Sequence, residues 1–277
     1  MLAPAKTTTA PETVHTPGID LLGVRVSALN LQSAVARILE AIGRGDRGYV
    51  CVCGAHGLVD CQRDDALRRA FNGAFLVTPD GMPLAWELRR QGHTEAGRVY
   101  GPDLMLALFR QPGLRHFLYG ATPGTLSRLQ ARLGRRFPHA TIVGSFAPPF
   151  RPLTAAEEED VIRRIEAAGP HIVWVGLGAP KQELWMARMH DRLQANILIG
   201  VGAAFDFHAG NTRQAPAWMQ NAGLEWAFRL AMEPRRLWRR YLRVVPGYMA
   251  LVALQRTGLR RFPAIGSHPP TPSDHAT

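Results

Sequence analysis

The sequence predicts an α/β fold, in which a Rossmann-like, mostly parallel sheet carries helices on both faces and is followed by a basic helical appendage. Along the first 210 residues, short apolar segments alternate with segments of helical period, which is typical of a parallel sheet. Between Ala215 and Thr257 no segment has a convincing strand pattern, so only helices are expected there.

Strands are expected where short runs are apolar and rich in β-branched residues. In order along the chain, these runs are Ile19–Val26, Tyr49–Cys53, Ala74–Thr78, His116–Tyr119, Thr141–Gly144, His171–Gly176 and Asn196–Val201. Helices are expected between them, where apolar residues recur with a period of about 3.6. These segments are Leu31–Ile42, Leu58–Phe71, Pro83–Arg90, Leu104–Phe109, Pro123–Arg136, Thr154–Ala168 and Lys181–Leu193. Thr154 and Glu157 form a capping box, which marks where one of these helices begins.

Prolines divide the C-terminal segment into several expected helices. Pro216, Pro234 and Pro246 each stand where a new helix can begin, because proline is favoured in the first helical turn. If the helices on either side of Pro234 are collinear, one face carries a row of arginines. This row comprises Arg229, Arg236, Arg239, Arg240 and Arg243.

We therefore expect an α/β domain over residues 18–210 and a helical appendage over 211–261, between a disordered leader (1–17) and a disordered tail (262–277). The leader lacks the apolar core of a signal peptide, and no run approaches the roughly 20 apolar residues that span a bilayer. The three cysteines, Cys51, Cys53 and Cys61, show no zinc-type spacing. A disulfide framework is not expected, which fits a reducing compartment.

The positive charge is concentrated near the C-terminal end. The chain has a formal net charge of +11, and the segment from Arg213 to Arg261 holds ten arginines against Glu225 and Glu233. Such a segment suits a polyanionic partner, and Trp226, Trp238 and Tyr241 within it favour an anionic membrane surface. A solvated charged face that packs on its own domain is the weaker alternative, because so few acids accompany the arginines.

One candidate ligand site follows the strand that ends near Gly176. Residues 176–183 read Gly-Leu-Gly-Ala-Pro-Lys-Gln-Glu, so glycines stand at a strand-to-helix turn. The backbone can approach a ligand there, and a helix N-terminus attracts anions. Lys181, Gln182 and Glu183 add polar groups at its mouth. The alternative is an ordinary tight turn.

A second candidate is Asp80, which directly follows another buried strand in Thr78-Pro79-Asp80-Gly81. A carboxylate at a strand end can act as a general base for a hydroxyl group. The alternative is that Asp80 only caps the helix expected at Pro83, and from position alone that alternative is favoured.

Three further positions lie at strand ends. Gly120 stands in a strand–glycine–helix turn that has neither common phosphate-loop pattern, so a structural turn is the favoured interpretation. His56 follows a strand and is either incidental or a hydrogen-bonding partner for a phosphate or sugar. Asp206 and His208 flank Phe207, so both could face a cleft. No set of metal ligands is found, and no metal is expected.

Taken together, these motifs resemble the WecG/TagA/CpsF family of bacterial glycosyltransferases, glycosyltransferase family 26, over roughly Leu21 to Leu242. The turn at Asp80 reads Pro-Asp-Gly-Met, and the second motif is Gly-Ala-Pro-Lys-Gln-Glu. The third is Gly-Val-Gly-Ala-Ala-Phe-Asp, ending at Asp206, and the fourth is the Arg-Gln-Ala-Pro…Glu-Trp…Arg…Glu-Pro-Arg-Arg tail. Four motifs in this order make the resemblance strong.

The resemblance implies an inverting, metal-independent transfer of a hexose or an N-acetylhexosamine, or its uronic acid, from a UDP-sugar. The acceptor would be a polyprenyl-diphosphate-linked sugar in cell-surface polysaccharide synthesis, on the cytoplasmic face of the bacterial plasma membrane. No cofactor is implied. The partners would be donor, acceptor and anionic membrane surface, with no nucleic acid; formation of a homo-oligomer is left open.

By the same resemblance, Asp80 is the general base, Gln182 lines the donor pocket, and Arg229, Arg236 and Arg239 hold the acceptor diphosphate. The neighbouring residues that are then expected to face lipid are Trp238, Arg240, Tyr241 and Arg243. We also expect substrate contacts from the other residues at the strand ends. These are Cys53, His56, Gly120, Lys181, Glu183 and Asp206.

The chain departs from the family at one place. Many members carry Thr-x-Asn after the second strand, where this chain has Cys53 and, one position beyond the Asn, His56.

Two other function classes fit the sequence less well. A dinucleotide-binding dehydrogenase is disfavoured, because the chain lacks GxGxxG and a following acidic residue. A non-enzymatic protein that binds nucleic acid or anionic lipid through the basic helices would leave the Asp80 turn unexplained.

Overall fold

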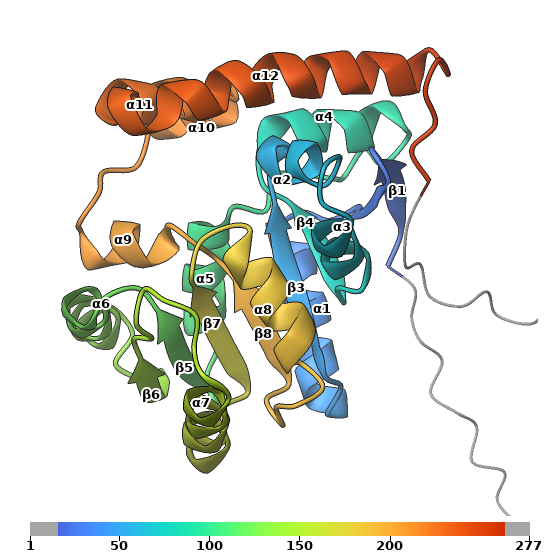
Figure 1. Ribbon diagram of the computed structural model, residues 1–277. Helices are drawn as coiled ribbons and strands as arrows, with labels where there is room; N and C mark the ends of the chain where they lie inside the picture. Colours follow the sequence, from blue (N-terminus) through green and yellow to red (C-terminus); the bar gives the residue numbers. More distant parts are fainter. Residues whose placement is uncertain (1–15, 264–277) are drawn as a thin grey trace, which may run out of the picture.

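The computed structural model describes residues 16–263, with the exception of the Arg236 side chain. It confirms the α/β prediction, because a six-stranded parallel sheet forms the centre of the molecule (Figure 1). The strand order is β4-β3-β8-β7-β5-β6. The strands are β3 (Gly48–Cys53), β4 (Leu76–Pro79), β5 (Arg115–Gly120), β6 (Thr141–Phe146), β7 (Ile172–Gly176) and β8 (Ile197–Gly200). Six of the seven expected strands are found in this sheet.

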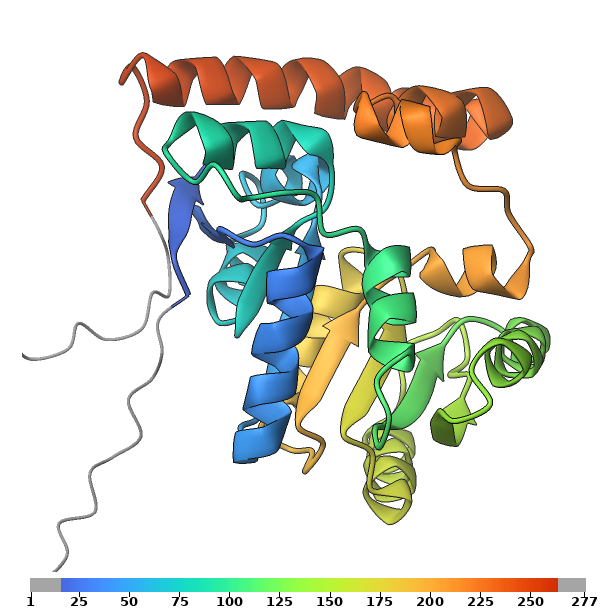
Figure 2. The ribbon, with the colours of Figure 1, turned by 180° about the vertical axis from the view of Figure 1, so that it is seen from behind.

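Helices cover both faces of the sheet and bury its alternating side chains. One face packs against α1 (Leu31–Arg44), α5 (Gly101–Phe109), α6 (Pro123–Arg136) and α9 (Ala204–Ala209) (Figure 2). The other face packs against α2 (Ala55–Asp60), α3 (Asp65–Asn72), α7 (Ala155–Ala168) and α8 (Lys181–Met189). Within β3, Val50 belongs to the first layer and Cys51 to the second, as the alternation of a strand requires. The capping box at Thr154 is present, and α7 begins directly after it.

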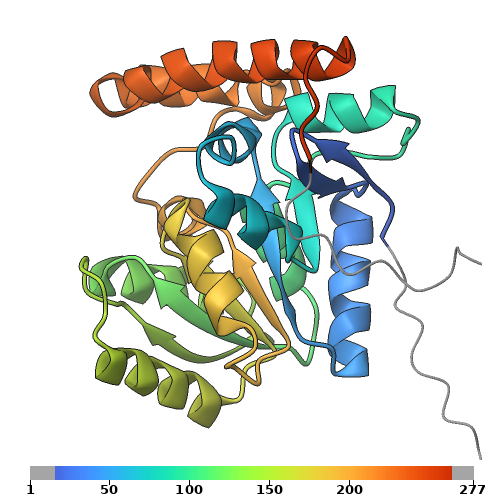
Figure 3. The same ribbon diagram turned by 45° about the vertical axis from the view of Figure 1, so that its right-hand side comes forward.

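The C-terminal residues form α10 (Ala217–Asn221), α11 (Glu225–Met232) and α12 (Pro234–Arg256). Figure 3 shows α12 running across one end of the molecule, beside α2 and α4 (Met82–Arg90). Tyr248 and Val252 of α12 belong to the same buried cluster as α2 and α3. The second half of α12 is therefore anchored in the core, and the division into two domains stays a prediction.

Three expectations about the elements were wrong. The segment Ile19–Val26 is a hairpin, β1 (Gly18–Leu21) and β2 (Val24–Ser27), because the chain turns at Leu22 and Gly23 with φ of 54° and 80°. Such a pair of positive φ values is the geometry of a two-residue hairpin turn. No typical turn dipeptide marks this turn, which is why the sequence pattern missed it.

The helix expected over Leu58–Phe71 is two helices, α2 and α3. The Asp64 side chain accepts a hydrogen bond from Leu67 N (2.9 Å) and caps α3. An aspartate in this position starts a new helix more readily than it continues an old one.

The third error concerns the prolines. Pro216 and Pro234 stand at helix starts, as expected, but Pro246 lies inside α12. Moreover, α11 and α12 are not collinear. The rings of Trp226 and Tyr241 lie 5.9 Å apart, whereas 15 residues of continuous helix would separate them by roughly 22 Å. The chain therefore turns at Glu233, and α11 folds back beside α12.

The expected leader and tail fall mostly outside the described residues, which exclude 1–15 and 264–277. Among the residues that are described, no helix is long and apolar enough to cross a membrane.

Candidate active site

The carboxyl ends of the six parallel strands lie along one edge of the sheet, and the candidate residues follow these ends. Asp80 follows β4, His56 follows β3, and Lys181 follows β7. This edge is where open parallel sheets bind ligands. Figure 1 shows the C-terminal helices lying over the same side of the molecule.

A backbone hydrogen bond fixes the position of Asp80, and its side chain is 26% exposed. Its N–H donates to the Cys53 carbonyl (2.8 Å), which fixes the turn to the neighbouring strand. Gly81 adopts a φ of +120° and is the N-cap residue of α4, with no side-chain capping bond. The alternative that Asp80 serves only as a helix cap is therefore wrong.

Arg98 faces Asp80, with 3.9 Å between its Nε and the Asp80 Oδ1. Its guanidinium carbon lies 3.9 Å from the centre of the Tyr100 ring. The other guanidinium nitrogens contact residues of the C-terminal helices: Nη1 donates to Gln220 Oε1 (2.8 Å), and Nη2 pairs with Glu225. Tyr100 donates its hydroxyl to Glu225 Oε1 (3.0 Å).

These four residues, Arg98, Tyr100, Gln220 and Glu225, were missed by sequence reasoning. Arg98 and Tyr100 stand in the segment between α4 and α5, where no strand end or glycine motif marks them. Their partner Glu225 is 127 residues from Arg98 along the chain. Only the position of Glu225 among basic residues gave a signal, because an isolated acid in an arginine-rich segment needs a reason.

The surroundings of Asp80 raise the pKa of its carboxyl group toward neutral pH. Burial raises the pKa of Asp80 to about 7, against the opposing effect of Arg98, and the nearby Glu225 carboxylate raises it further. A carboxyl group with a pKa near the working pH suits general acid–base catalysis.

His56 lies close to Asp80 because Gly54 leaves room between them. A Cβ on Gly54 would meet His56 Nδ1 at 3.1 Å and the Asp80 carbonyl oxygen at 3.2 Å. Burial lowers the pKa of His56 to about 3, and Arg240 and Arg229 lower it further. The imidazole is therefore neutral, so one of its nitrogens can donate and the other can accept a hydrogen bond.

The arginines of the C-terminal helices are distributed differently from the expectation. Arg229 lies over the Phe207 ring (5.8 Å) and acts electrostatically on both Asp80 and His56. Arg240, which was expected to face lipid, is half-buried; burial lowers its pKa, and it acts on His56 and Glu183. The site therefore contains Arg240, which sequence reasoning placed outside it.

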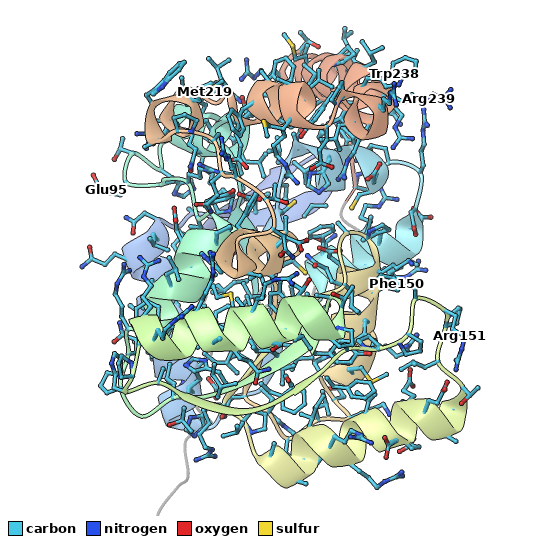
Figure 4. The ribbon with its side chains drawn as sticks, turned by 90° about the vertical axis from the view of Figure 1, so that its left-hand side faces the viewer. Glu95, Phe150, Arg151, Met219, Trp238 and Arg239 are labelled. Carbon is cyan, nitrogen blue, oxygen red and sulfur yellow. The ribbon has the colours of Figure 1, made fainter. Side chains whose placement is uncertain are left out.

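Arg239, by contrast, is exposed and lies 5.3 Å from the Trp238 ring. Figure 4 shows both residues at the outer end of the C-terminal helices. Arg243 pairs with Asp60 (3.1 Å), and Tyr241 packs on Trp226. The Arg236 side chain lies outside the described residues. Arg229 and Arg239 therefore have different surroundings, one over the Phe207 ring and the other exposed beside Trp238, and the shared role of the trio stays a prediction.

The first turn of α8 places two polar residues in the interior. Gln182 is 4% and Glu183 1% exposed, and Gln182 Nε2 donates to Glu183 Oε1 (2.9 Å). Within the described part of the chain, Gln182 Oε1 and Glu183 Oε2 have no hydrogen-bond partner. Burial raises the pKa of Glu183. An unpaired buried amide oxygen calls for a partner, whereas Lys181 is exposed to solvent.

Other expected contacts have structural explanations. Cys53 is 1% exposed with its Sγ against the Gly54 carbonyl (3.6 Å), and burial raises its pKa, so it offers little surface to a ligand. Gly120 has a φ of +127°, and a Cβ there would lie 2.5 Å from the Gly176 carbonyl. Close strand packing therefore accounts for this glycine.

Asp206 and His208 lie on the short helix α9, which follows β8. Asp206 accepts a hydrogen bond from Asn211 (2.8 Å), and the His208 ring bonds the Pro102 carbonyl (3.0 Å). Because residues two apart on a helix point in different directions, Asp206 and His208 do not share one face of α9.

A cavity of about 460 Å³ lies where α6 meets α9. Its lining includes Arg132, Arg135, Arg136, His208 and Phe207. Of the lining residues, Phe207 has its ring 6.4 Å from the Tyr100 ring. Its basic lining suits an anionic group. Across residues 16–263, no three histidine, cysteine or acidic side chains group together as metal ligands.

The chain matches a known protein family. A family model described as "Glycosyl transferase WecG/TagA/CpsF family" matches residues 19–262. The match covers every residue of the site described above, including those that the motifs did not mark.

Proposed function

The chain belongs to the WecG/TagA/CpsF family of glycosyltransferases, which act in cell-surface polysaccharide synthesis, and we propose that it carries out an inverting, metal-independent sugar transfer. The donor is a UDP-linked hexose, N-acetylhexosamine or its uronic acid. The acceptor is a polyprenyl-diphosphate-linked sugar, and the enzyme works at the inner face of the plasma membrane.

The observation that carries this proposal is Asp80, a carboxyl group at a strand end whose pKa is raised to about 7 by burial. In the proposed step, the acceptor hydroxyl attacks the anomeric carbon of the donor sugar and gives its proton to Asp80. The new carbon–oxygen bond forms as the bond to UDP breaks, and UDP leaves with the electron pair. One base suffices for inversion.

The leaving diphosphate needs positive charge close to it. Arg229 and Arg240 are near His56 and Asp80 and are suitable for this role. The neutral His56 ring is suitable for a hydrogen bond to a sugar hydroxyl. The unpaired Gln182 Oε1 can accept a further hydrogen bond from the UDP-sugar. Arg239, which is exposed beside Trp238, is better suited to a lipid surface.

Support for membrane attachment comes from the outer face of α12. Trp238, Leu242 and Met249 are 45%, 67% and 66% exposed, and their spacing places them on one side of the helix. Exposed aromatic and aliphatic side chains among arginines suit an anionic bilayer surface.

The proposal is tested by incubating the purified protein with polyprenyl-diphosphate-sugar and a panel of UDP-sugars, and by identifying the lipid product. We expect one donor to give an inverted linkage, with activity retained in EDTA. A requirement for Mg²⁺ or Mn²⁺ would overturn the metal-independent step. Absence of product with every donor, together with salt-dependent DNA binding, would favour the non-enzymatic alternative.

A further inference from the structure

An acidic residue of the C-terminal helices reaches the only cation in contact with Asp80 that the described residues show. Glu225 stands in the first turn of α11, and its carboxylate pairs with Arg98. Arg98 is 12% and Glu225 17% exposed, so the pair is largely shielded from water. Such shielding makes the geometry of a charge pair matter more than it does at a surface.

The Arg98 guanidinium is clamped on several sides. Glu225 holds Nη2, and Gln220 accepts from Nη1 (2.8 Å). Tyr100 lies against the flat face and donates to Glu225 (3.0 Å). Three residues therefore fix both the position and the plane of the arginine.

The nitrogen that faces Asp80 is left without a hydrogen bond. Arg98 Nε is buried and unpartnered within the described residues, and it lies 3.9 Å from Asp80 Oδ1. A hydrogen bond would need about 2.7–3.2 Å. Arginine and a carboxylate otherwise favour a close, bidentate pair, so the clamp holds Arg98 short of that pairing.

We propose that Glu225 is a positioning residue, which holds Arg98 back from Asp80 and so keeps the Asp80 carboxylate available to accept the proton of the acceptor hydroxyl. This inference rests on the transfer reaction proposed above. A full ion pair with Arg98 would stabilise the ionised form of Asp80 and weaken it as a base.

The clamp also links the base to the C-terminal helices. Gln220 belongs to α10 and Glu225 to α11, whereas Arg98 and Tyr100 belong to the segment before α5. A displacement of α10 and α11 would remove both partners of Arg98 and leave Asp80 as the remaining carboxylate beside it. The proposed role of Glu225 therefore depends on the seating of these helices.

The charged groups that face Asp80 come from several elements. They are Arg98, Glu225, Arg229 and Asp103. Of these, Glu225 alone is bonded to Arg98, so its substitution changes both a charge and a position.

The experiment is a ¹³C NMR titration of aspartate carboxyl groups in the full-length protein, which needs no substrate. The Asp80 signal is assigned by its loss in Asp80→Asn. In Glu225→Gln we expect the Asp80 midpoint to fall by about 1–3 pH units, the effect of a released arginine pairing with a carboxylate. Tyr100→Phe keeps the ring but removes the hydroxyl that orients Glu225, so its shift should be smaller and in the same direction.

Glu158→Gln is the matched control. Glu158 is 18% exposed, stands in α7 and pairs with Arg188 of α8 and with Arg192, which follows α8. It is not among the charged groups that act on Asp80. It should leave the Asp80 midpoint unchanged. Where a donor supports turnover, Glu225→Gln should also lower kcat at pH 8 by roughly tenfold, part of what a general base contributes, while the KM for the UDP-sugar stays the same.

The two proposals fail in different ways. An Asp80 midpoint that stays unchanged in both Glu225→Gln and Tyr100→Phe overturns the role of Glu225. A shifted midpoint with an unchanged kcat also overturns it. If no donor is turned over, the proposed function is overturned. The titration still decides whether Glu225 holds Arg98 away from Asp80.

Discussion

At the residue scale, Asp80 illustrates how a carboxyl group can be kept near neutrality inside a positively charged protein. Burial raises its pKa to about 7, Arg98 opposes that rise, and Glu225 adds to it. In the unfolded chain the pKa of aspartate is about 3.9. Between these values the native state binds the proton more tightly than the unfolded chain does, so the stabilising contribution of Asp80 is full below pH 4 and is lost as the pH rises through about 7.

Asp80→Asn should therefore lower the transfer activity and raise the stability of the fold. We expect transfer to fall by about 10²–10⁴-fold, the usual contribution of a general base. At pH 8 the free energy of unfolding should rise by about 1–3 kcal/mol, because an ionised and partly buried carboxylate is removed. Urea unfolding at pH 5 and pH 8 measures this, and the gain should be larger at pH 8. A gain independent of pH would contradict the raised pKa.

The contribution of His56 to stability depends on pH in the opposite direction. Burial and two arginines lower its pKa to about 3, whereas the pKa of an unfolded histidine is about 6.5. Its stabilising contribution is present above pH 6.5 and is lost as the pH falls toward 3. We expect the His56 ring signals in an NMR titration to stay constant between pH 5 and pH 8. A midpoint within that window would show that the ring is open to solvent.

Sequence patterns identified those site residues that follow a strand end. Asp80, His56 and Gln182 each directly follow a strand or begin the next helix, and the structure has them at those positions. Arg98 and Glu225 could not be found in this way, because they are 127 residues apart in the sequence and meet only in the folded chain. No local pattern records such a pairing.

At the element scale, α12 shows why a proline was misinterpreted. Pro246 removes a backbone hydrogen bond to the Leu242 carbonyl, yet α12 continues past it to Arg256 and is 23 residues long in all. Leu242 and Pro246 are both exposed, so water can serve the unpaired carbonyl. Leu237, on one side of the proline, and Tyr248, on the other, are buried and hold both halves in place.

This anchoring predicts that the second half of α12 contributes to global stability. Tyr248→Ala should lower the free energy of unfolding by about 2–4 kcal/mol, since a large side chain is removed from the buried cluster. The neighbouring Met249→Ala is the control, because Met249 is 66% exposed and a surface change usually costs less than about 0.5 kcal/mol. Equal effects in urea unfolding would show that α12 is not seated on the core.

At the scale of the whole molecule, the sheet was predictable because each βα unit has its own local pattern, a short apolar run followed by a segment of helical period. The arrangement of α10–α12 has no such local pattern. The sequence predicted helices in the segment after residue 215 but left open whether they continue in line across Pro234. The contact between Trp226 and Tyr241 depends on the turn at Glu233, which only tertiary packing sets.

Because α12 supplies core residues, deleting the C-terminal helices is not a clean test of membrane binding. Point changes on the outer face avoid this difficulty. Trp238, Leu242 and Met249 are exposed, whereas the residues that anchor the helix lie on the other side. Substitution of all three by serine should leave the unfolding transition unchanged and abolish binding to anionic vesicles in a sedimentation assay.

The remaining attraction should then be electrostatic and weak. Each arginine near an anionic surface contributes about 1 kcal/mol, and this falls off within a Debye length. Binding of the wild-type protein should therefore weaken as salt is raised, and neutral vesicles should bind little of it. Phe150→Ser is the matched control: Phe150 is 86% exposed and lies well away from α12 (Figure 4), so its loss should leave vesicle binding intact. If the triple variant binds as well as the wild type, the outer face of α12 is not the membrane surface, and the arginines alone must account for any attachment.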